Sequence, residues 1–244
     1  MDRQCYAGKE SNQLQPVPAS VKPSAFEFSH PVSHVQLLLL LQGHGKLTFS
    51  NNDVYIGNWD FNMRHGKGLM MFANGSTYNG DWEDNHQTGR GQLEYANGDL
   101  YVGGFLRGHR HGEGRHLHKD GSQYEGSFDH DKRHGFGVYT CEAFTYRGDW
   151  ADDVQSGRAE MTYPSGDMYR GEVEHGKKQG DGVFSSHDGS VYVGQFQADC
   201  KHGIGKITYS DGSTYEGEWS GGVRQGQGML TATNGDTYGV LLCC

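Results

Sequence analysis

Residues 215–237 read YEGEWSGGVRQGQGMLTATNGDT. This stretch opens with Tyr-x-Gly-x-Trp at Tyr215, continues with Gly-x-Gly at Gly226 and closes with Asn-Gly at Asn234. Side chains at every second position of an extended chain share one face. The tyrosine, the glycine and the tryptophan of the opening therefore predict a strand with one aromatic face, and the final Asn-Gly predicts a turn.

The same pattern recurs along most of the chain. Its tyrosines are separated by 23 residues, and once by 22: Tyr55, Tyr78, Tyr101, Tyr124, Tyr146, Tyr169, Tyr192, Tyr215 and Tyr238. Fixed-period repetition is the signature of a repeat architecture. Each copy holds two strands, so the chain is predicted to be all-β: a single elongated, twisted antiparallel sheet of tandem β-hairpins, solenoid-like, with sixteen or seventeen strands.

Turn residues support this interpretation. Asn-Gly and Asp-Gly pairs such as Asn74-Gly75 join one repeat to the next and predict type I′ turns, which need positive φ at both centres. The connection inside each repeat, such as Asp60 to His65, is predicted to be longer. The fourth repeat lacks the pair and runs through residues 141–145, where we expect an irregular turn.

Composition narrows the class of protein. Phe, Trp and Tyr account for 11, 4 and 14 residues, and this aromatic content disfavours a disordered chain. Gly accounts for 39 residues, and so much Gly disfavours a core built from aliphatic side chains. The net charge of −9 gives no attraction for nucleic acid. The five cysteines show no CxxC pair and are expected to be free thiols. The longest apolar run, Leu37 to Leu41, is too short for a membrane span, so a soluble cytoplasmic protein is expected.

The repeat unit resembles the MORN repeat (membrane occupation and recognition nexus), and residues 215–237 are its best-preserved copy. On this resemblance, residues 55–237 hold eight repeats, residues 42–54 a half-repeat, and residues 238–244 a truncated ninth repeat or a tail. Residues 1–41, rich in Pro, Ser and Gln, are expected to be disordered. The resemblance implies a ciliary, flagellar or cytoskeletal setting.

The aromatic face is the first candidate site. The large rings four residues after each tyrosine are predicted anchors for a protein partner: Trp59, Trp82, Phe105, Phe128, Trp150, Phe196 and Trp219. The face is expected to be concave and to hold an amphipathic helix, from a partner or from Val35 to Leu41. The alternative is that the rings pack on one another and seal the face without a partner.

A row of basic residues is the second candidate site. They precede the Gly-x-Gly pairs in the predicted longer loops: Arg64, His65, Arg110, His111, Arg133, His134, Lys178, Lys201 and Arg224. Stacked in register, they would line one margin of the sheet and bind acidic phospholipid. The alternative is that they are solvated loop charges, since Asp131, Asp153 and Asp199 share these loops.

The sequence shows no catalytic or metal-binding motif, and no cofactor is expected. His109, His111, His116 and His118 crowd together, but no nearby Cys or carboxylate completes a ligand set. The favoured hypothesis is a non-enzymatic scaffold. The alternatives are a phosphoinositide-binding membrane adaptor and the repeat module of a larger enzyme. Two chains are also expected to pair through sheet edges, aided by the apolar stretch Val240 to Leu242.

Overall fold

The computed structural model describes residues 40–242, which form eighteen β-strands. The strands are β1 (Gly43–Thr48), β2 (Val54–Asp60), β3 (Met63–Met71), β4 (Thr77–Glu83), β5 (His86–Glu94), β6 (Leu100–Leu106), β7 (His109–Leu117), β8 (Gln123–Asp129), β9 (Lys132–Thr140), β10 (Thr145–Ala151), β11 (Val154–Thr162), β12 (Met168–Glu174), β13 (Lys177–Ser185), β14 (Val191–Gln197), β15 (Cys200–Thr208), β16 (Thr214–Ser220), β17 (Val223–Thr231) and β18 (Thr237–Leu242). The predicted disordered segment lies outside the described residues except for Leu40 and Leu41. No helix within residues 40–242 is long and apolar enough to cross a membrane.

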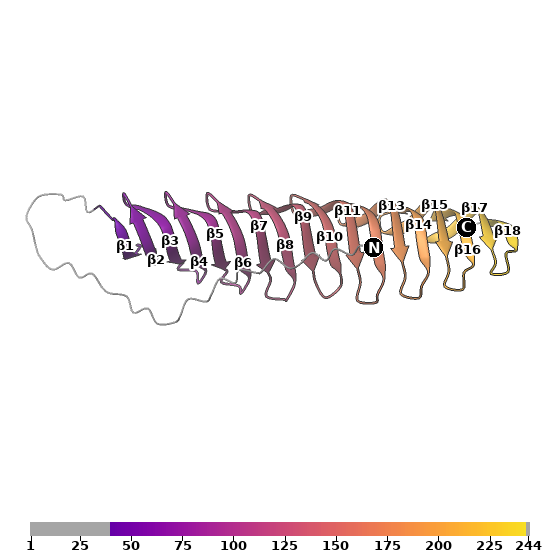
Figure 1. Cartoon of the computed structure of the whole chain (residues 1–244), viewed down its shortest axis with the longest axis horizontal. Coiled ribbons are helices and arrows are strands. Elements are labelled where there is room, and N and C mark those ends of the chain that lie inside the picture. Colours follow the sequence, from indigo (N-terminus) through magenta and orange to yellow (C-terminus); the bar gives the residue numbers. More distant parts are fainter. Residues whose placement is uncertain (1–39, 243–244) are drawn as a thin grey trace, which may run out of the picture. The chain divides into compact units, whose positions relative to one another are not determined.

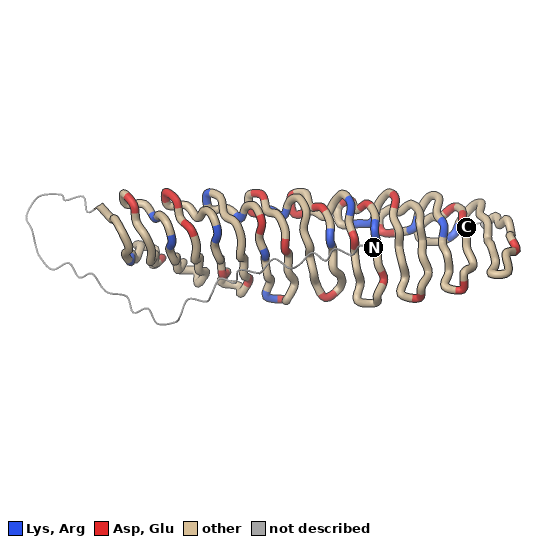
Figure 2. The backbone as a smooth tube through the Cα atoms, in the orientation of Figure 1, with Lys and Arg blue, Asp and Glu red and all other residues tan. Residues whose placement is uncertain are grey.

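Every strand pairs antiparallel with its neighbours in the chain, so the sheet is an open meander whose strands follow one another in sequence order (Figure 1). The predicted fold class is confirmed. The number of strands is eighteen rather than sixteen or seventeen, because residues 237–242 pair with β17 as a further strand. Basic and acidic residues are interspersed along the sheet without a large block of one sign (Figure 2).

The turn inside each repeat is only two residues long. Between β2 and β3, Phe61 and Asn62 have φ angles of 45° and 66°, and the equivalent pairs of the other seven repeats also have positive φ. Positive φ at both central residues defines the type I′ turn, whose twist matches that of the flanking strands. The prediction of a longer connection here was wrong, because the strands extend to the edge of this pair.

The Asn-Gly and Asp-Gly pairs lie in the turns between repeats, which are not type I′. In the first of them, the Phe72 N–H donates to the Ser76 carbonyl at 2.9 Å, and Gly75 has φ of 91°. Asn74 does not have positive φ, and its Oδ1 accepts the Ser76 N–H at 2.9 Å. This is a type I turn followed by a left-handed glycine. Asparagine is favoured because its side chain closes the turn, not because of its own φ.

The fourth repeat has a shorter turn, with the Cys141 N–H donating to the Phe144 carbonyl at 3.0 Å. The shortening is associated with a lost hydrogen bond in the core. Trp82 Nε1 donates to the Gly68 carbonyl at 3.1 Å, whereas Trp150 Nε1 is buried without a partner among residues 40–242.

The core is a single layer of rings on one face of the sheet, which we call the aromatic face. The repeat tyrosines from Tyr55 to Tyr215 are at most 1% exposed. Tyr55 makes edge-to-face contacts with Trp59 of its own repeat and Trp82 of the next, at centroid distances of 5.0 and 5.3 Å. Its hydroxyl donates to the Asn58 carbonyl at 3.0 Å. Repetition of these contacts builds the core in a single layer, with Val173 in place of a ring in the sixth repeat.

Candidate functional site

The seven rings that we predicted as partner anchors belong to this core. Trp59, Trp82, Phe105, Phe128, Trp150, Phe196 and Trp219 are between 3% and 6% exposed. The rings pack on one another and on the tyrosines. Their faces are therefore not available to a partner in this conformation.

The basic residues lie on top of these rings instead of along a loop margin. Arg64 is in β3 and stands directly opposite Trp59 in the register of β2 and β3. Directly opposed residues of an antiparallel pair share one face, so the cation lies on the aromatic face. The same register position holds Arg110, Arg133, Lys178, Lys201 and Arg224, while Gln87 and Gln155 occupy it in two repeats.

Each cation stacks on rings of the core. The guanidinium of Arg133 lies 4.2 Å from the centroid of Trp150, and that of Arg64 lies 4.5 Å from the centroid of Trp82. Lys201 Nζ is 5.2 Å from the centroid of Trp219. A contact of this kind is worth about 0.5–1 kcal/mol when exposed and about 2 kcal/mol when desolvated. The two candidate sites of the sequence are thus one surface, with rings below and cations above.

Three of the cations are clamped to the next repeat. The backbone N–H and Nε of Arg133 both donate to Asp153 Oδ1, at 3.0 and 2.9 Å. Arg110 makes the equivalent contacts with Asp131, and Arg64 makes them with Asn85. Burial raises the pKa of Asp131, but hydrogen bonds from Arg110 and His109 outweigh it and leave that pKa below its ordinary value.

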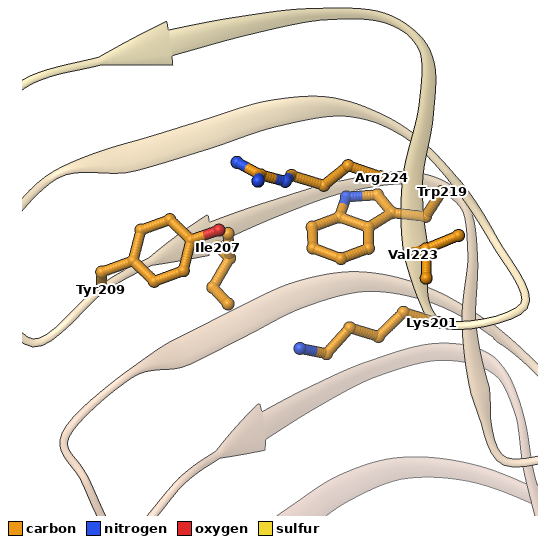
Figure 3. A pocket seen from close by; sticks show the side chains of 7 residues that line it. Lys201, Ile207, Tyr209, Trp219, Val223 and Arg224 are labelled. Atoms are coloured by element: carbon orange, nitrogen blue, oxygen red, sulfur yellow. The ribbon is translucent and has the colours of Figure 1, made fainter. Parts of the chain in front are cut away.

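The other three cations, Lys178, Lys201 and Arg224, make no ion pair with any residue between 40 and 242. Burial lowers the pKa of Lys201. Lys201 and Arg224 flank the indole of Trp219 in a hollow of about 430 Å³, into which Tyr209 also points (Figure 3). This end of the aromatic face therefore offers positive charge and apolar surface together.

The histidines of the basic row separate from their neighbouring arginines. His65 and His111 contact Asp84 and Asp129, at 4.0 and 3.2 Å. No ion pair of His134 is found within the described part of the chain. The Arg-His pairs predicted as a single lipid-binding row are thus divided, and only the Arg and Lys members lie over the rings.

The cluster of four histidines also divides. His109 contacts Asp131 at 2.6 Å, whereas His116 and His118 lie beside Asp99, which the sequence interpretation did not include. Burial lowers the pKa of His116 to about 4, helped by the nearby charges of His118 and Arg110. The signal that could have identified Asp99 is the repeat itself, because the residue two before each tyrosine sits in the turn between repeats.

No curated protein matches the chain. Among solved structures, the TCP10 domain of Danio rerio CPAP in complex with a peptide of Danio rerio STIL is 16% identical, with a TM-score of 0.44 over 80% of this chain and 93% of that chain. A point mutant of that domain is 13% identical, with a TM-score of 0.45 over 81% of this chain and 99% of that chain. A catalytically inactive virginiamycin B lyase from Staphylococcus aureus, with quinupristin, is 11% identical over 86% of this chain and 73% of that chain, at a TM-score of 0.15. Likeness at these scores carries no inference about ligands.

The repeats themselves match a known family. The MORN repeat is found in nine segments, at residues 40–54, 55–77, 78–100, 101–123, 124–142, 146–168, 169–191, 192–214 and 215–237. These segments cover nearly all of the sheet, and their hairpins share the core of stacked tyrosines described above. The chain therefore belongs to the MORN-repeat family.

Proposed function

We propose that the chain is a non-enzymatic scaffold that binds protein partners on the aromatic face. The observation that carries the proposal is the run of Lys178, Lys201 and Arg224 on successive repeats. Their side chains make no ion pair within residues 40–242, in contrast to those of Arg110 and Arg133, although the backbone N–H of Lys178 donates to Asp199 Oδ1 at 2.9 Å. Cations that make no ion pair on the aromatic face favour binding of a negatively charged partner.

Apolar side chains border the cations and give the partner something to bury. Tyr163 and Phe184 are partly buried, and their ring centroids lie 5.3 and 5.1 Å from Lys178 Nζ. Tyr209 is partly buried and lines the hollow beside Trp219. We therefore infer an acidic segment with interspersed apolar residues as the ligand. It would contact the cations and these outer rings, not the deep rings that we first predicted as anchors.

The pitch of the sheet sets the spacing of acidic residues in such a partner. Successive cations are two strands apart, or about 9.6 Å, since neighbouring strands are about 4.8 Å apart. An extended segment rising about 3.1–3.4 Å per residue meets successive cations at every third residue. The amphipathic helix expected from the sequence, rising about 1.5 Å per residue, meets them at every sixth or seventh residue.

Acidic phospholipid is the alternative ligand of the same cations. Juxtaposed basic residues near an anionic surface contribute about 1 kcal/mol each. Arg110 and Arg133 are already paired with aspartates, which leaves fewer cations for a membrane than the predicted row contained. The structure therefore favours the protein partner, and liposomes serve as a comparison ligand.

The cellular location and the oligomeric state are separate proposals, and each rests on a single observation. A ciliary, flagellar or cytoskeletal assembly follows from the family resemblance alone, and proximity labelling in ciliated cells tests it. End-to-end pairing of two chains follows from β18, whose exposed Leu241 lies at the end of the described sheet. Sedimentation of the wild type against Leu241→Lys tests the pairing.

Selection from an unbiased library of displayed peptides tests the proposed function. We expect the wild-type chain to enrich acidic peptides, and the spacing of their carboxylates to distinguish an extended segment from a helix. The K201E/R224E variant should lose the enriched peptides. Enrichment of neutral or basic peptides would contradict the proposal. Binding to phosphatidylserine or phosphoinositide liposomes without selection of any peptide would favour the lipid alternative.

A further inference from the structure

One repeat departs from the others at the outer edge of the aromatic face. The two positions that carry Met70 and Phe72 in the first repeat, both apolar, carry His116 and His118 in the third. The two imidazole rings are 4.1 Å apart between centroids. Both face the carboxylate of Asp99, from the turn between β5 and β6.

Asp99 is already oriented by the fold. Its Oδ1 accepts the backbone N–H of Lys119 at 3.0 Å, as Asp53 Oδ1 accepts that of Ala73 in the first repeat. This contact stacks one turn on the next and leaves Oδ2 to hydrogen-bond with His118 Nδ1. Oδ2 lies 3.2 Å from His118 Nδ1 and 3.7 Å from His116 Nε2.

These spacings match the ligand shell of a small divalent cation. A tetrahedral Zn²⁺ with bonds of about 2.0–2.1 Å holds its ligand atoms about 3.3–3.4 Å apart. The three ligand atoms of Asp99, His116 and His118 all lie within 4.8 Å of one another. His116 Nε2 is buried and lacks a hydrogen-bond partner among the described residues. An orphaned buried nitrogen aimed at a carboxylate is the arrangement that a metal ion satisfies.

We propose that Asp99, His116 and His118 form a binding site for a divalent first-row transition metal, with Zn²⁺ as its natural probe. Two imidazoles and one carboxylate supply three ligands, and the exposed edge of His118 leaves the fourth position to water. The ion would join the turn before β6 to the end of β7, and so fasten two successive repeats.

One neighbouring contact limits the affinity. Arg110 Nη1 donates to His116 Nδ1 at 3.3 Å, so Nε2 of the neutral ring carries its proton when no metal is bound. Metal binding at Nε2 requires the other tautomer, with the proton on Nδ1, so Nδ1 no longer accepts from Arg110 and the guanidinium keeps only its hydrogen bonds to Asp131. We therefore expect a site weaker than the closed four-ligand sites of zinc fingers.

A second group, His111, Asp129 and His130, provides a matched comparison. Its ligand atoms are also within 4.8 Å of one another, but Asp129 and His130 are exposed. Like Asp99 Oδ2 with His118 Nδ1, Asp129 Oδ1 is hydrogen-bonded to His130 Nδ1, at 2.5 Å, and His111 Nδ1 is buried without a partner among the described residues, so the two groups differ in their exposure. We therefore expect the ion at the more buried Asp99 group and not at this one.

Titration calorimetry of the full chain with Zn²⁺ tests the assignment, with Co²⁺ absorption as a second readout. We expect one ion per chain with a tetrahedral Co²⁺ spectrum free of thiolate bands. Asp99→Asn and His118→Gln should each weaken binding at least tenfold, while His130→Gln leaves it unchanged. His118→Gln removes a partly exposed ring, so it remains informative if Asp99→Asn does not fold. Absence of binding in the wild type would overturn the proposal, and so would loss only in His130→Gln or equal binding by all variants.

Discussion

Tyr78 lies so close over Gly91 that a Cβ atom added to the glycine would stand 2.5 Å from Cε2 of the phenol ring. The ring has no room to move away, because it is fully buried and its hydroxyl donates to the Asp81 carbonyl at 3.0 Å. Gly91 is paired with Gly80, so the backbone beneath the ring is bare on both strands. The core of this single-layer sheet therefore depends on the paired glycines, which leave room for the rings, as much as on the aromatic side chains.

Gly91→Ala tests this relationship. We expect a loss of about 1–3 kcal/mol in the free energy of unfolding, since the added methyl overpacks the core. Urea unfolding measures the loss. Gly45→Ala is the matched control, because Gly45 has the same place in its Gly-x-Gly pair but its added Cβ would meet Trp59 at an ordinary 3.7 Å. Equal destabilisation by the two substitutions would show that the close approach of Tyr78 is not what excludes a side chain at Gly91.

The buried tyrosines predict the behaviour of the sheet in alkali. Burial raises the pKa of Tyr55, Tyr124 and Tyr192 to about 12. A phenol whose pKa is raised by folding stabilises the native state below its unfolded pKa of about 10, and this stability is lost as pH rises from 10 towards 12. Phenolate absorbance should therefore rise cooperatively with the loss of far-UV β signal. Ionisation of all tyrosines near pH 10 with the β signal intact would show that these rings are not in the core.

The short fourth repeat predicts unequal effects of the same substitution. Trp82→Phe removes a hydrogen bond to the Gly68 carbonyl, whereas Trp150→Phe removes an N–H that has no partner within residues 40–242. Both indoles lie under an arginine, so the loss of cation–π contact is similar. We expect Trp82→Phe to cost about 1 kcal/mol more in thermal or urea unfolding. A larger cost for Trp150→Phe would be the opposite of this expectation.

The clamp between repeats is tested at Asp131. Asp131→Ala removes the acceptor of the Arg110 N–H and Nε and strains a residue whose φ is 71°. We expect a loss of about 1 kcal/mol, since the carboxylate is partly exposed and its charge is screened. Asp131→Asn retains an acceptor and tolerates positive φ, so its unfolding midpoint should lie between those of the alanine variant and the wild type. Two variants of equal stability would assign the clamp to charge alone.

The sequence was sufficient for the sheet, because the period of two within each repeat and the period of 23 between repeats leave few other folds. It was misleading at the turns, where Asn74 acts through its side chain and Phe61 accepts a positive φ that its residue type does not signal. The candidate site could be predicted from the sequence only in part. The sequence located a basic residue before most Gly-x-Gly pairs, but only the register opposite Trp59 shows that Arg64 lies over the rings. Pairing with the next repeat, which neutralises Arg110 and Arg133 but not Lys201, depends on side-chain distances that a linear pattern does not contain.

Binding of an acidic protein segment by the unpaired cations of the aromatic face is the proposed function. Isothermal titration with the strongest peptide selected by the wild-type chain tests it most directly. K201E/R224E should weaken binding at least tenfold. The control variant K46E/K177E has the same change in net charge, but its two lysines are exposed and do not lie over the rings. It should retain the affinity of the wild type within about twofold. Equal losses in the two variants would mean that net charge alone attracts the peptide, and undiminished binding by K201E/R224E would place the partner elsewhere on the sheet.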